Sequence, residues 1–411
     1  MTIVLIILCV LLVSMTKLAI NYRHSQACWA DYSTQQAEEF AGACLQAEQQ
    51  FLFAQKQAAT SWQAEQTLAL INKVAECEHS ASFYFAHPNG EPLPPFHAGQ
   101  YLTFSFSLPN TPEPVVRCYS ISEYTQTPSH YRVTVKRMLD YQDKHVIPTG
   151  LISNYLHDNT KVGDRIAVQA PQGKFTLKDT ATPLVLIAGG IGITPLFSIM
   201  QEALTHNPER EIWLLYAVYN GTQHPLKDEI NTFHSYANVR IQTVYRHPLA
   251  TDRLGIDYDH STLINRAHLQ ATLPSNNYAF YLCGPPAMLE SLLKELTAWG
   301  VPVHDIYYEA FGPASIKRDP QASILCTPHP VEFTVSNIEA SWQPADGTLL
   351  EFAEALGLHL RFGCRAGRCG TCALDLGEGQ VEYITEPEAR IQPGKCLVCI
   401  AKPKQAVKVS A

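Results

Sequence analysis

The sequence has no excess of basic residues and no internal repeat. Its 30 lysines and arginines are outnumbered by 38 aspartates and glutamates, which gives a formal net charge of −8. A basic surface is the usual mark of a nucleic-acid-binding protein, so the charge balance gives no support to that class. No solenoid-type repeat is visible in the 411 residues. The 46% share of apolar residues is typical of a globular protein, and the length predicts two to four domains.

The first sixteen residues lack charge altogether. Lys17 and Arg23 come after this apolar run, whereas a secretory signal peptide carries its positive charge before the apolar stretch. We therefore expect residues 1–20 to be a single-pass transmembrane anchor, with the other domains on the cytoplasmic side. A cleaved or mis-assigned leader is the alternative. Residues 21–66 have an apolar face at helical spacing and are predicted to be a helical spacer, which either packs on the protein or self-associates.

Downstream of the spacer, the pattern of apolar residues changes twice. Residues 67–178 read as short strands separated by proline and glycine clusters, which predicts an antiparallel β-barrel. Residues 179–314 alternate strands with helices, as a doubly wound α/β domain does. Residues 315–328 show no periodicity and are expected to be a linker, and residues 329–411 form a last unit. The predicted fold class is therefore multidomain α+β.

The twelve cysteines do not suit a disulfide framework, which is typical of short secreted chains, and five of them lie in the last fifty residues. Cys364, Cys369 and Cys372 have the C-x4-C-x2-C spacing of plant-type ferredoxins, with a later cysteine at position 396 or 399. This pattern predicts a 2Fe-2S cluster in a β-grasp domain. In such ferredoxins the last ligand lies in a Leu-x-Cys unit, and the resemblance to that unit favours Cys399 over Cys396.

The run Arg117-Cys118-Tyr119-Ser120 lies on a predicted barrel strand. It resembles the Arg-x-Tyr-Ser/Thr motif of the ferredoxin–NADP reductase superfamily, in which the motif holds a flavin. The resemblance implies that Arg117 pairs with the flavin phosphates, that Tyr119 covers the isoalloxazine ring and that Ser120 reaches its N5 edge. Four residues are a short match, and an exposed strand without a ligand is the alternative.

Two further segments support a flavin. Gly150, Ile152 and Ser153 precede a predicted helix start, and helix N-termini bind phosphate through their free N–H groups. In the family this Gly-x-x-Ser segment cradles the flavin pyrophosphate. Lys136 lies on a stretch that resembles the family's second flavin-contacting strand. The phthalate dioxygenase reductase type uses FMN, but the closer resemblance is to the reductase part of flavohaemoglobins, which implies FAD in the barrel.

A glycine-rich loop follows the first predicted strand of the α/β domain and opens a helix. It is not the G-x-G-x-x-G fingerprint, but it resembles the G-G-x-G-x-T/S-P loop of the same superfamily. Glycines in such a loop let the pyrophosphate of a dinucleotide approach the backbone. The resemblance assigns NAD(P) binding to Gly189, Gly190, Gly192, Thr194 and Pro195.

Two later strand ends complete the expected reduction site. Cys283, Gly284 and Pro285 match the family's Cys-Gly-Pro segment, which lies under the nicotinamide. The cysteine would shape that pocket, and it can be a buried core thiol at the same time. Glu309 and Phe311 end the last strand, where the family places an acidic and an aromatic residue at the flavin face. The candidate catalytic residues are therefore Ser120, Cys283, Glu309 and Phe311.

NADH is preferred to NADPH because Tyr219 and Asn220 follow the second strand of the domain, where readers of the 2′-phosphate usually offer Arg or Lys; Arg246 ends the next strand. The resemblance implies hydride transfer from NADH to FAD, then single electrons through the 2Fe-2S cluster to a partner protein. We expect a membrane-associated desaturase, oxygenase, hydroxylase or hybrid-cluster protein as the acceptor. The alternatives are a respiratory reductase that feeds quinone or a redox pump, and a redox sensor or scaffold without turnover.

Overall fold

The chain divides into two compact units, Met1–Thr60 and Ser61–Ala411. The structure is a computed structural model, and it describes residues 17, 62, 65–109, 111, 114–142, 145–148, 150–178, 182–311 and 328–411. The predicted anchor at residues 1–20 therefore lies outside the described residues apart from Lys17, as do nearly all of the spacer and the linker. No helix in the described part of the chain is long and apolar enough to cross a membrane.

Six antiparallel strands form the first domain of the larger unit, in the order β4-β3-β8-β1-β2-β5. A bridge between Ile121 and Val133 joins the chain after β4 to β5, so the two edges of the sheet meet and the barrel closes. Phe83, Phe85 and Phe104 point into the core of the barrel. The strands are β1 (Gln66–Cys77), β2 (Ser80–Ala86), β3 (Tyr101–Phe106), β4 (Val115–Ser120), β5 (Tyr131–Lys136) and β8 (Arg165–Gln172).

A hairpin and one short helix interrupt the barrel between β5 and β8. The hairpin consists of β6 (Leu139–Gln142) and β7 (His145–Pro148), and the helix is α2 (Leu151–Asp158). Helix α2 buries Ile152 in the barrel core. The N-terminus of α2 is thereby fixed beside the barrel strands.

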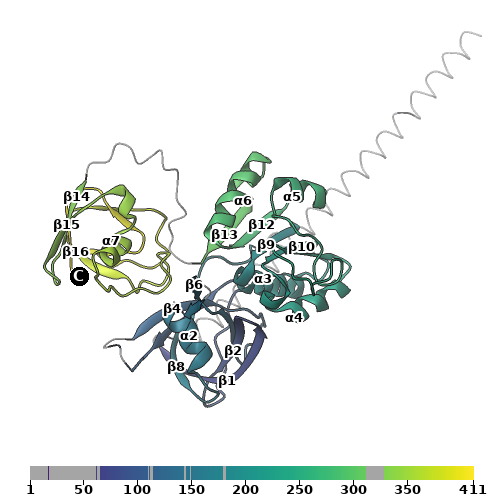
Figure 1. The fold of residues 1–411 in the computed structure, drawn as a ribbon, viewed down its shortest axis with the longest axis horizontal. Helices are drawn as coiled ribbons and strands as arrows, with labels where there is room; N and C mark the ends of the chain where they lie inside the picture. The colour runs from purple at the N-terminus through teal and green to yellow at the C-terminus, as the bar shows by residue number, and fades with distance from the viewer. Residues whose placement is uncertain are drawn as a thin grey trace, which may run out of the picture. The chain divides into compact units, whose positions relative to one another are not determined.

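The second domain is a parallel five-stranded sheet with helices on both faces. Its strand order is β11-β10-β9-β12-β13. The chain adds β10 and β11 on one side of β9 and then β12 and β13 on the other side, as in doubly wound folds. Helices α3 and α4 share one apolar core with the sheet, and α5 and α6 share the other (Figure 1). The elements are β9 (Leu184–Gly189), α3 (Ile193–His206), β10 (Ile212–Val218), α4 (Lys227–Thr232), β11 (Val239–Tyr245), α5 (Arg266–Thr272), β12 (Ala279–Gly284), α6 (Pro286–Ala298) and β13 (Ile306–Ala310).

The C-terminal domain is a small mixed sheet packed on one helix, which is the β-grasp arrangement predicted from the sequence. Strand β14 pairs with β15 antiparallel and with β20 parallel, and Phe333 and Phe352 meet in the core. Thr348 and Glu351 cap the helix reciprocally. The elements are β14 (His329–Phe333), β15 (Ile338–Trp342), α7 (Leu349–Ala355), β16 (Ala373–Glu378), β17 (Val381–Tyr383), β18 (Lys395–Leu397), β19 (Ala401–Pro403) and β20 (Val407–Val409).

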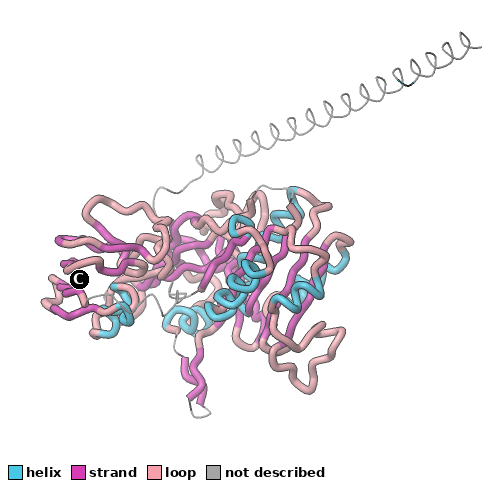
Figure 2. Tube along the Cα trace, turned by 90° about the horizontal axis from the view of Figure 1, so that it is seen from above, coloured by secondary structure: helices cyan, strands magenta, loops and turns pink. Residues whose placement is uncertain are grey.

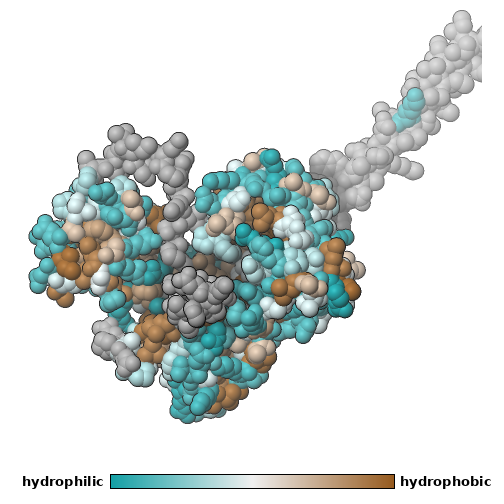
Figure 3. Space-filling model, viewed as in Figure 1, coloured by the Kyte–Doolittle hydropathy of each residue, from teal (hydrophilic) through white to brown (hydrophobic). Residues whose placement is uncertain are grey.

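Strands, drawn in magenta in Figure 2, are the main regular element of the described chain, and the helices are short. On the face drawn in Figure 3, apolar residues are scattered among polar ones. Scattered apolar residues are normal on a soluble surface and need no ligand to explain them.

Candidate functional site

The four cysteines of the ferredoxin motif gather as two pairs. Cys372 Sγ lies 3.0 Å from Cys399 Sγ. Cys364 and Cys369 form the other pair, in which the backbone N–H of each donates to the sulfur of the other, at 3.3 and 3.4 Å. Within the described ranges, no three or more His, Cys, Asp or Glu side chains converge on a single metal-ion position. Two thiolate pairs fit a binuclear 2Fe-2S cluster, whose four ligands are shared between two irons.

The loop between the cysteines presents its backbone to sulfur. The N–H groups of Ala366 and Arg368 donate to Cys364 Sγ at 3.4 and 3.2 Å. Such contacts stabilise a thiolate and tune a cluster. A hydrogen bond from the Cys118 thiol is the main cause that lowers the pKa of Cys369. Cys396 is fully buried in the domain core, and its assignment as an ordinary thiol stays a prediction.

The predicted flavin strand β4 faces this loop. Cys118 lies against the sulfurs of Cys364 and Cys369, and its own Sγ is 3.5 Å from Thr103 Oγ1 on β3. The sequence analysis passed over Cys118, because the family motif leaves this position open. A side chain on β4 thus joins the flavin motif to the cluster motif directly.

The other side chains of the motif alternate along β4. The Arg117 guanidinium stacks on the Phe362 ring, 4.4 Å from its centroid, and donates to the Val116 carbonyl at 2.7 Å. Tyr119 packs edge-on against Phe104, with 5.9 Å between ring centroids. Ser120 is buried and is paired in register with Tyr101 on β3. Their predicted contacts with the flavin phosphates, ring and N5 edge remain predictions.

The N-terminus of α2 suits a phosphate group. Gly150 is its N-cap residue, and no side chain caps the helix, so its first N–H groups are free for an anion. A Cβ at Gly150 would collide with Ser153 Oγ and with Met138, which explains the glycine. Ser153 Oγ accepts from the Met138 N–H at 3.2 Å. Ile152 faces the core, so it contributes through its backbone.

Lys136 does not turn toward α2. Its Nζ donates to Gln223 Oε1 at 3.2 Å, across the junction with the α/β domain. The structure therefore separates Lys136 from the Gly150–Ser153 segment, while its predicted contact with the flavin remains a prediction.

The glycine-rich loop and the Cys-Gly-Pro segment pack on each other. Gly190–Gly192 form a single 3-10 turn between β9 and α3. A Cβ at Gly192 would collide with the Cys283 carbonyl, so only glycine permits this close approach. Gly189 lies against Gly284 and Pro285 in the same way. The two motifs thus form one surface at the carboxyl ends of β9 and β12, where open α/β sheets bind ligands.

Helix α3 starts at this surface without a side-chain cap, and so it offers its first N–H groups to a pyrophosphate. Thr194 Oγ1 donates to the Ile191 carbonyl at 3.0 Å, which holds the turn. Pro195 occupies the first helical turn, where a missing N–H costs nothing. Burial raises the pKa of Cys283, which suits a pocket wall rather than a nucleophile.

The C-terminal domain contacts this surface at Glu309. This residue is paired in register with Cys283, is 3% exposed, and accepts a hydrogen bond from Arg368 Nη1 in the cluster-binding loop. Burial raises the pKa of Glu309, and the charge of Arg368 acts in the opposite direction. The nearby Ser120 hydroxyl also lowers the pKa of this carboxyl group. Phe311 packs beside the sheet core as a partly buried residue.

Arg368 and Glu388 were missed by the sequence analysis. Arg368 Nε is 3.2 Å from Glu388 Oε1, so the guanidinium bridges two carboxylates. Arg368 was seen only as a loop position between two cysteines, and no spacing rule links it to Glu309, 59 residues earlier. A cleft of about 450 Å³ opens beside it, lined by Tyr101, Gly173, Lys174, Arg368, Cys369 and Arg390.

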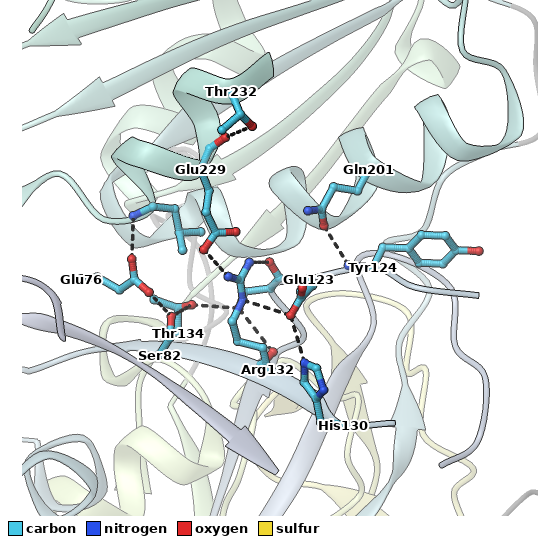
Figure 4. Close-up of polar contacts among 12 residues, drawn as sticks. Glu76, Ser82, Glu123, Tyr124, His130, Arg132, Thr134, Gln201, Glu229 and Thr232 are labelled. Atoms are coloured by element: carbon cyan, nitrogen blue, oxygen red, sulfur yellow. Dashed lines mark hydrogen bonds and ion pairs between the residues drawn. The ribbon is translucent and has the colours of Figure 1, made fainter. Parts of the chain in front are cut away.

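A second buried arginine joins the barrel to the α/β domain (Figure 4). Arg132 on β5 is 1% exposed, and its guanidinium donates to Glu229 on α4 and to the Ser122 carbonyl. Its Nε lies 3.8 Å from Glu123 Oε2. Close by, Gln201 on α3 accepts from the Tyr124 N–H at 2.8 Å. These contacts fix the barrel against the nucleotide surface.

Three families match consecutive parts of the chain. Residues 67–177 match the oxidoreductase FAD-binding domain, residues 186–294 the oxidoreductase NAD-binding domain, and residues 333–404 the 2Fe-2S iron-sulfur cluster binding domain. The domains at each motif are thus those that the sequence predicted, in the same order.

Among curated proteins, the chain is 37% identical over 258 residues to a flavohemoprotein of Rhodopirellula baltica, covering 61% of the chain and 62% of the relative. It is 32% identical over 279 residues to a flavohemoprotein of Halalkalibacterium halodurans, covering 67% of each. The chain thus spans about 60% of the length of the first flavohemoproteins that it matches.

Two solved structures extend the comparison. The flavohem-like FAD/NAD binding domain of a nitric oxide dioxygenase from Vibrio cholerae is 30% identical, with a TM-score of 0.54, and is covered completely by 61% of this chain. Phthalate dioxygenase reductase is 24% identical, with a TM-score of 0.53, and 84% of this chain covers 98% of it. The second likeness shows that all three domains occur together in a known fold.

Proposed function

Because this chain belongs to the ferredoxin–NADP reductase superfamily and carries a C-terminal 2Fe-2S domain, we propose that it delivers electrons from NADH, one at a time, to a separate acceptor protein. It is an NAD(P)H-dependent oxidoreductase whose cofactors are FAD, NADH and a 2Fe-2S cluster. The observation that carries the proposal is the contact of the flavin strand with the cluster-binding loop. The Arg117 guanidinium lies 4.4 Å from the centroid of the Phe362 ring, and a Cβ on Gly363 would approach both Val116 and Cys369 Sγ.

The described residues suit this task by position rather than by acid–base chemistry. Bound FAD would supply acceptance of a hydride from NADH, and a bound 2Fe-2S cluster would supply one-electron acceptance, with one proton released to solvent for each NADH oxidised. The α2 N-terminus at Gly150 and Ser153 would hold the flavin pyrophosphate, and Tyr119 and Ser120 would meet its ring. The turn Gly190–Gly192 would hold the dinucleotide.

The preference for NADH over NADPH rests on the end of β10. Asn220 is buried there, and its Oδ1 accepts from the Thr222 N–H at 3.2 Å. An amide held in this way offers no positive charge to a 2′-phosphate. Arg246 follows the neighbouring strand β11, and its backbone N–H donates to the Val218 carbonyl. An Asn220→Arg variant should improve the use of NADPH.

We propose a membrane-associated acceptor, namely an oxygenase, a desaturase or a hybrid-cluster protein. The support is the uncharged run at residues 1–16, which is followed by Lys17 and Arg23. This pattern suits a single-pass anchor at residues 1–20 with the catalytic domains on the cytoplasmic side. Expression of the full chain followed by carbonate extraction of membranes tests this part. Release of the protein by carbonate would contradict the anchor.

The reductase proposal is tested with two artificial acceptors. In Cys369→Ser, cytochrome c reduction should be lost while ferricyanide reduction by NADH survives, because ferricyanide accepts electrons from the flavin without the cluster. Cys396→Ser is the matched control, since Cys396 is a buried thiol outside the two pairs; it should keep both activities. Persistence of cytochrome c reduction in Cys369→Ser would show that electrons leave elsewhere.

A further inference from the structure

We propose that Arg368 is a positioning residue that docks the cluster-binding loop on the flavin site through Glu309. This inference rests on the proposed function and adds to it the contact that sets the rate of flavin-to-cluster electron transfer. Neither Arg368 nor the pairing with Glu309 follows from any of the motifs. Three sets of contacts support this role.

The first set places Arg368 at the cluster itself. Its backbone N–H donates to Cys364 Sγ at 3.2 Å, and the next residue is the ligand Cys369. Its side chain is only 15% exposed and is paired with Glu309. Arg368 therefore connects a sulfur of the cluster-binding loop, through its backbone, to Glu309, through its side chain.

The second set places the partner at the reduction site. Glu309 is fixed by sheet register beside Cys283, the predicted wall of the nicotinamide pocket. The Ser120 hydroxyl of the flavin motif is near enough to its carboxyl group to lower the pKa of that group. Its Oε1 pairs with Arg368, while Oε2 is buried without a partner within the described residues. A buried carboxylate of this kind needs its cation, so the loop has a strong preference for this place.

The third set shows that the fit is tight around the ion pair. Glu388, also in the C-terminal domain, holds Arg368 Nε at 3.2 Å and so keeps the guanidinium pointed at Glu309. A Cβ on Gly363 would approach both Cys369 Sγ and Val116 of β4 within 3.4 Å. With Cys118 against the same ligands, the loop and β4 are in direct contact, and a small loss of register would lengthen the path between flavin and cluster.

The test uses the full-length holoprotein in stopped-flow absorbance. NADH is mixed with Arg368→Met and with wild type, and bleaching of the flavin band is separated from bleaching of the cluster band. The rate of cluster reduction relative to that of flavin reduction should fall at least about tenfold in Arg368→Met. Arg368→Lys should lie between the two, because lysine keeps a point charge but cannot bridge Glu309 and Glu388.

The matched control is Arg390→Ala, which removes a charge from the same cleft at an exposed residue with no ion pair to Glu309; it should reduce its cluster as wild type does. Cluster content is measured by the electron paramagnetic resonance of the reduced protein. If Arg368→Met does not load its cluster, Arg368→Gln is compared with Arg368→Lys, and equal rates in those two contradict the proposal.

Two other results would also overturn the inference. One is a wild-type rate ratio in a cluster-loaded Arg368→Met protein, and the other is an equal loss in Arg390→Ala. Failure of the wild type to reduce cytochrome c at all would instead contradict the proposed function. The two failures are therefore distinguishable.

Discussion

Two buried arginines join the domains of the larger unit. The two ion pairs differ in whether the arginine or its carboxylate partner is the more buried group. At the first junction Arg132 is 1% exposed, while the side chains of Glu229 and Glu123 are 42% and 34% exposed. At the second, Glu309 is 3% exposed and Arg368 is 15% exposed. A guanidinium cannot lose its proton in a protein, whereas a buried carboxylate can gain one. At the first junction the buried group, Arg132, is therefore always charged and has a structural role. At the second junction the buried group is the Glu309 carboxylate, which lies at the reduction site.

The largest loss of stability should come from removing both carboxylate partners of Arg132. In the double variant Glu123→Gln with Glu229→Gln, the arginine remains buried without a carboxylate, and we expect a loss of about 3 kcal/mol in the free energy of unfolding. Urea unfolding of the holoprotein, followed by flavin fluorescence, measures it. A loss below about 1 kcal/mol would remove the distinction between the two junctions.

Acid should weaken the first junction through His224, which lies just before α4. Burial lowers the pKa of His224 to about 3, and its Nδ1 is 2.9 Å from the Tyr245 hydroxyl. The unfolded chain, with a histidine pKa near 6.5, binds the proton more readily, so stability is lost as the pH falls from about 6.5 to about 3. The loss from this group at pH 5 should be about 2 kcal/mol.

Thermal unfolding of wild type and His224→Phe at pH 7 and pH 5 tests this assignment. The phenylalanine keeps a ring against Tyr216 and Tyr245, so the variant should lose less stability between the two pH values than wild type does. An unchanged pH dependence would place the acid-sensitive group elsewhere and leave the first junction untouched by acid.

A smaller effect is expected from removing Arg132 itself. In Arg132→Met the two acids reach water, and the buried Ser122 carbonyl loses its hydrogen bond from the guanidinium. We expect a cost of about 1.5 kcal/mol, less than that of the double glutamine variant. The same urea titration compares the two. An Arg132→Met protein less stable than the double variant would reverse the order and show that packing, not charge, dominates this junction.

The smallest change in stability is expected at an exposed ion pair, which serves as a reference for the two buried ones. Arg137 pairs with Asp158, whose side chain is 51% exposed, at the end of α2. Asp158→Asn should change the free energy of unfolding by less than about 1 kcal/mol, and high salt should abolish the difference. A large, salt-independent effect would mean that exposure is a poor guide to the strength of the two buried junctions.

The sequence by itself determined which chemistry each domain carries. The spacing from Cys364 to Cys372 is local, so the cluster motif could be identified without the fold. The glycines at 150 and 192 are also readable, because their neighbours in space lie in motifs that the sequence already marks. Alternating and helical periodicities likewise predicted the barrel and the parallel sheet, since each depends on near neighbours in the chain. The β-grasp domain was predicted from the cysteine motif that it carries.

Only the tertiary structure decided how the motifs meet. Cys118 occupies an open position in its motif, and its role becomes visible when β4 and the cluster-binding loop come together. Arg368 and Glu309 are 59 residues apart and belong to different domains, so no periodicity connects them. Lys136 turns toward Gln223 for the same reason, because long side chains follow the charges and dipoles that packing brings near them. Local chemistry is thus encoded in short spacings, whereas the path between the flavin strand and the cluster is set by contacts that form only when the domains pack together.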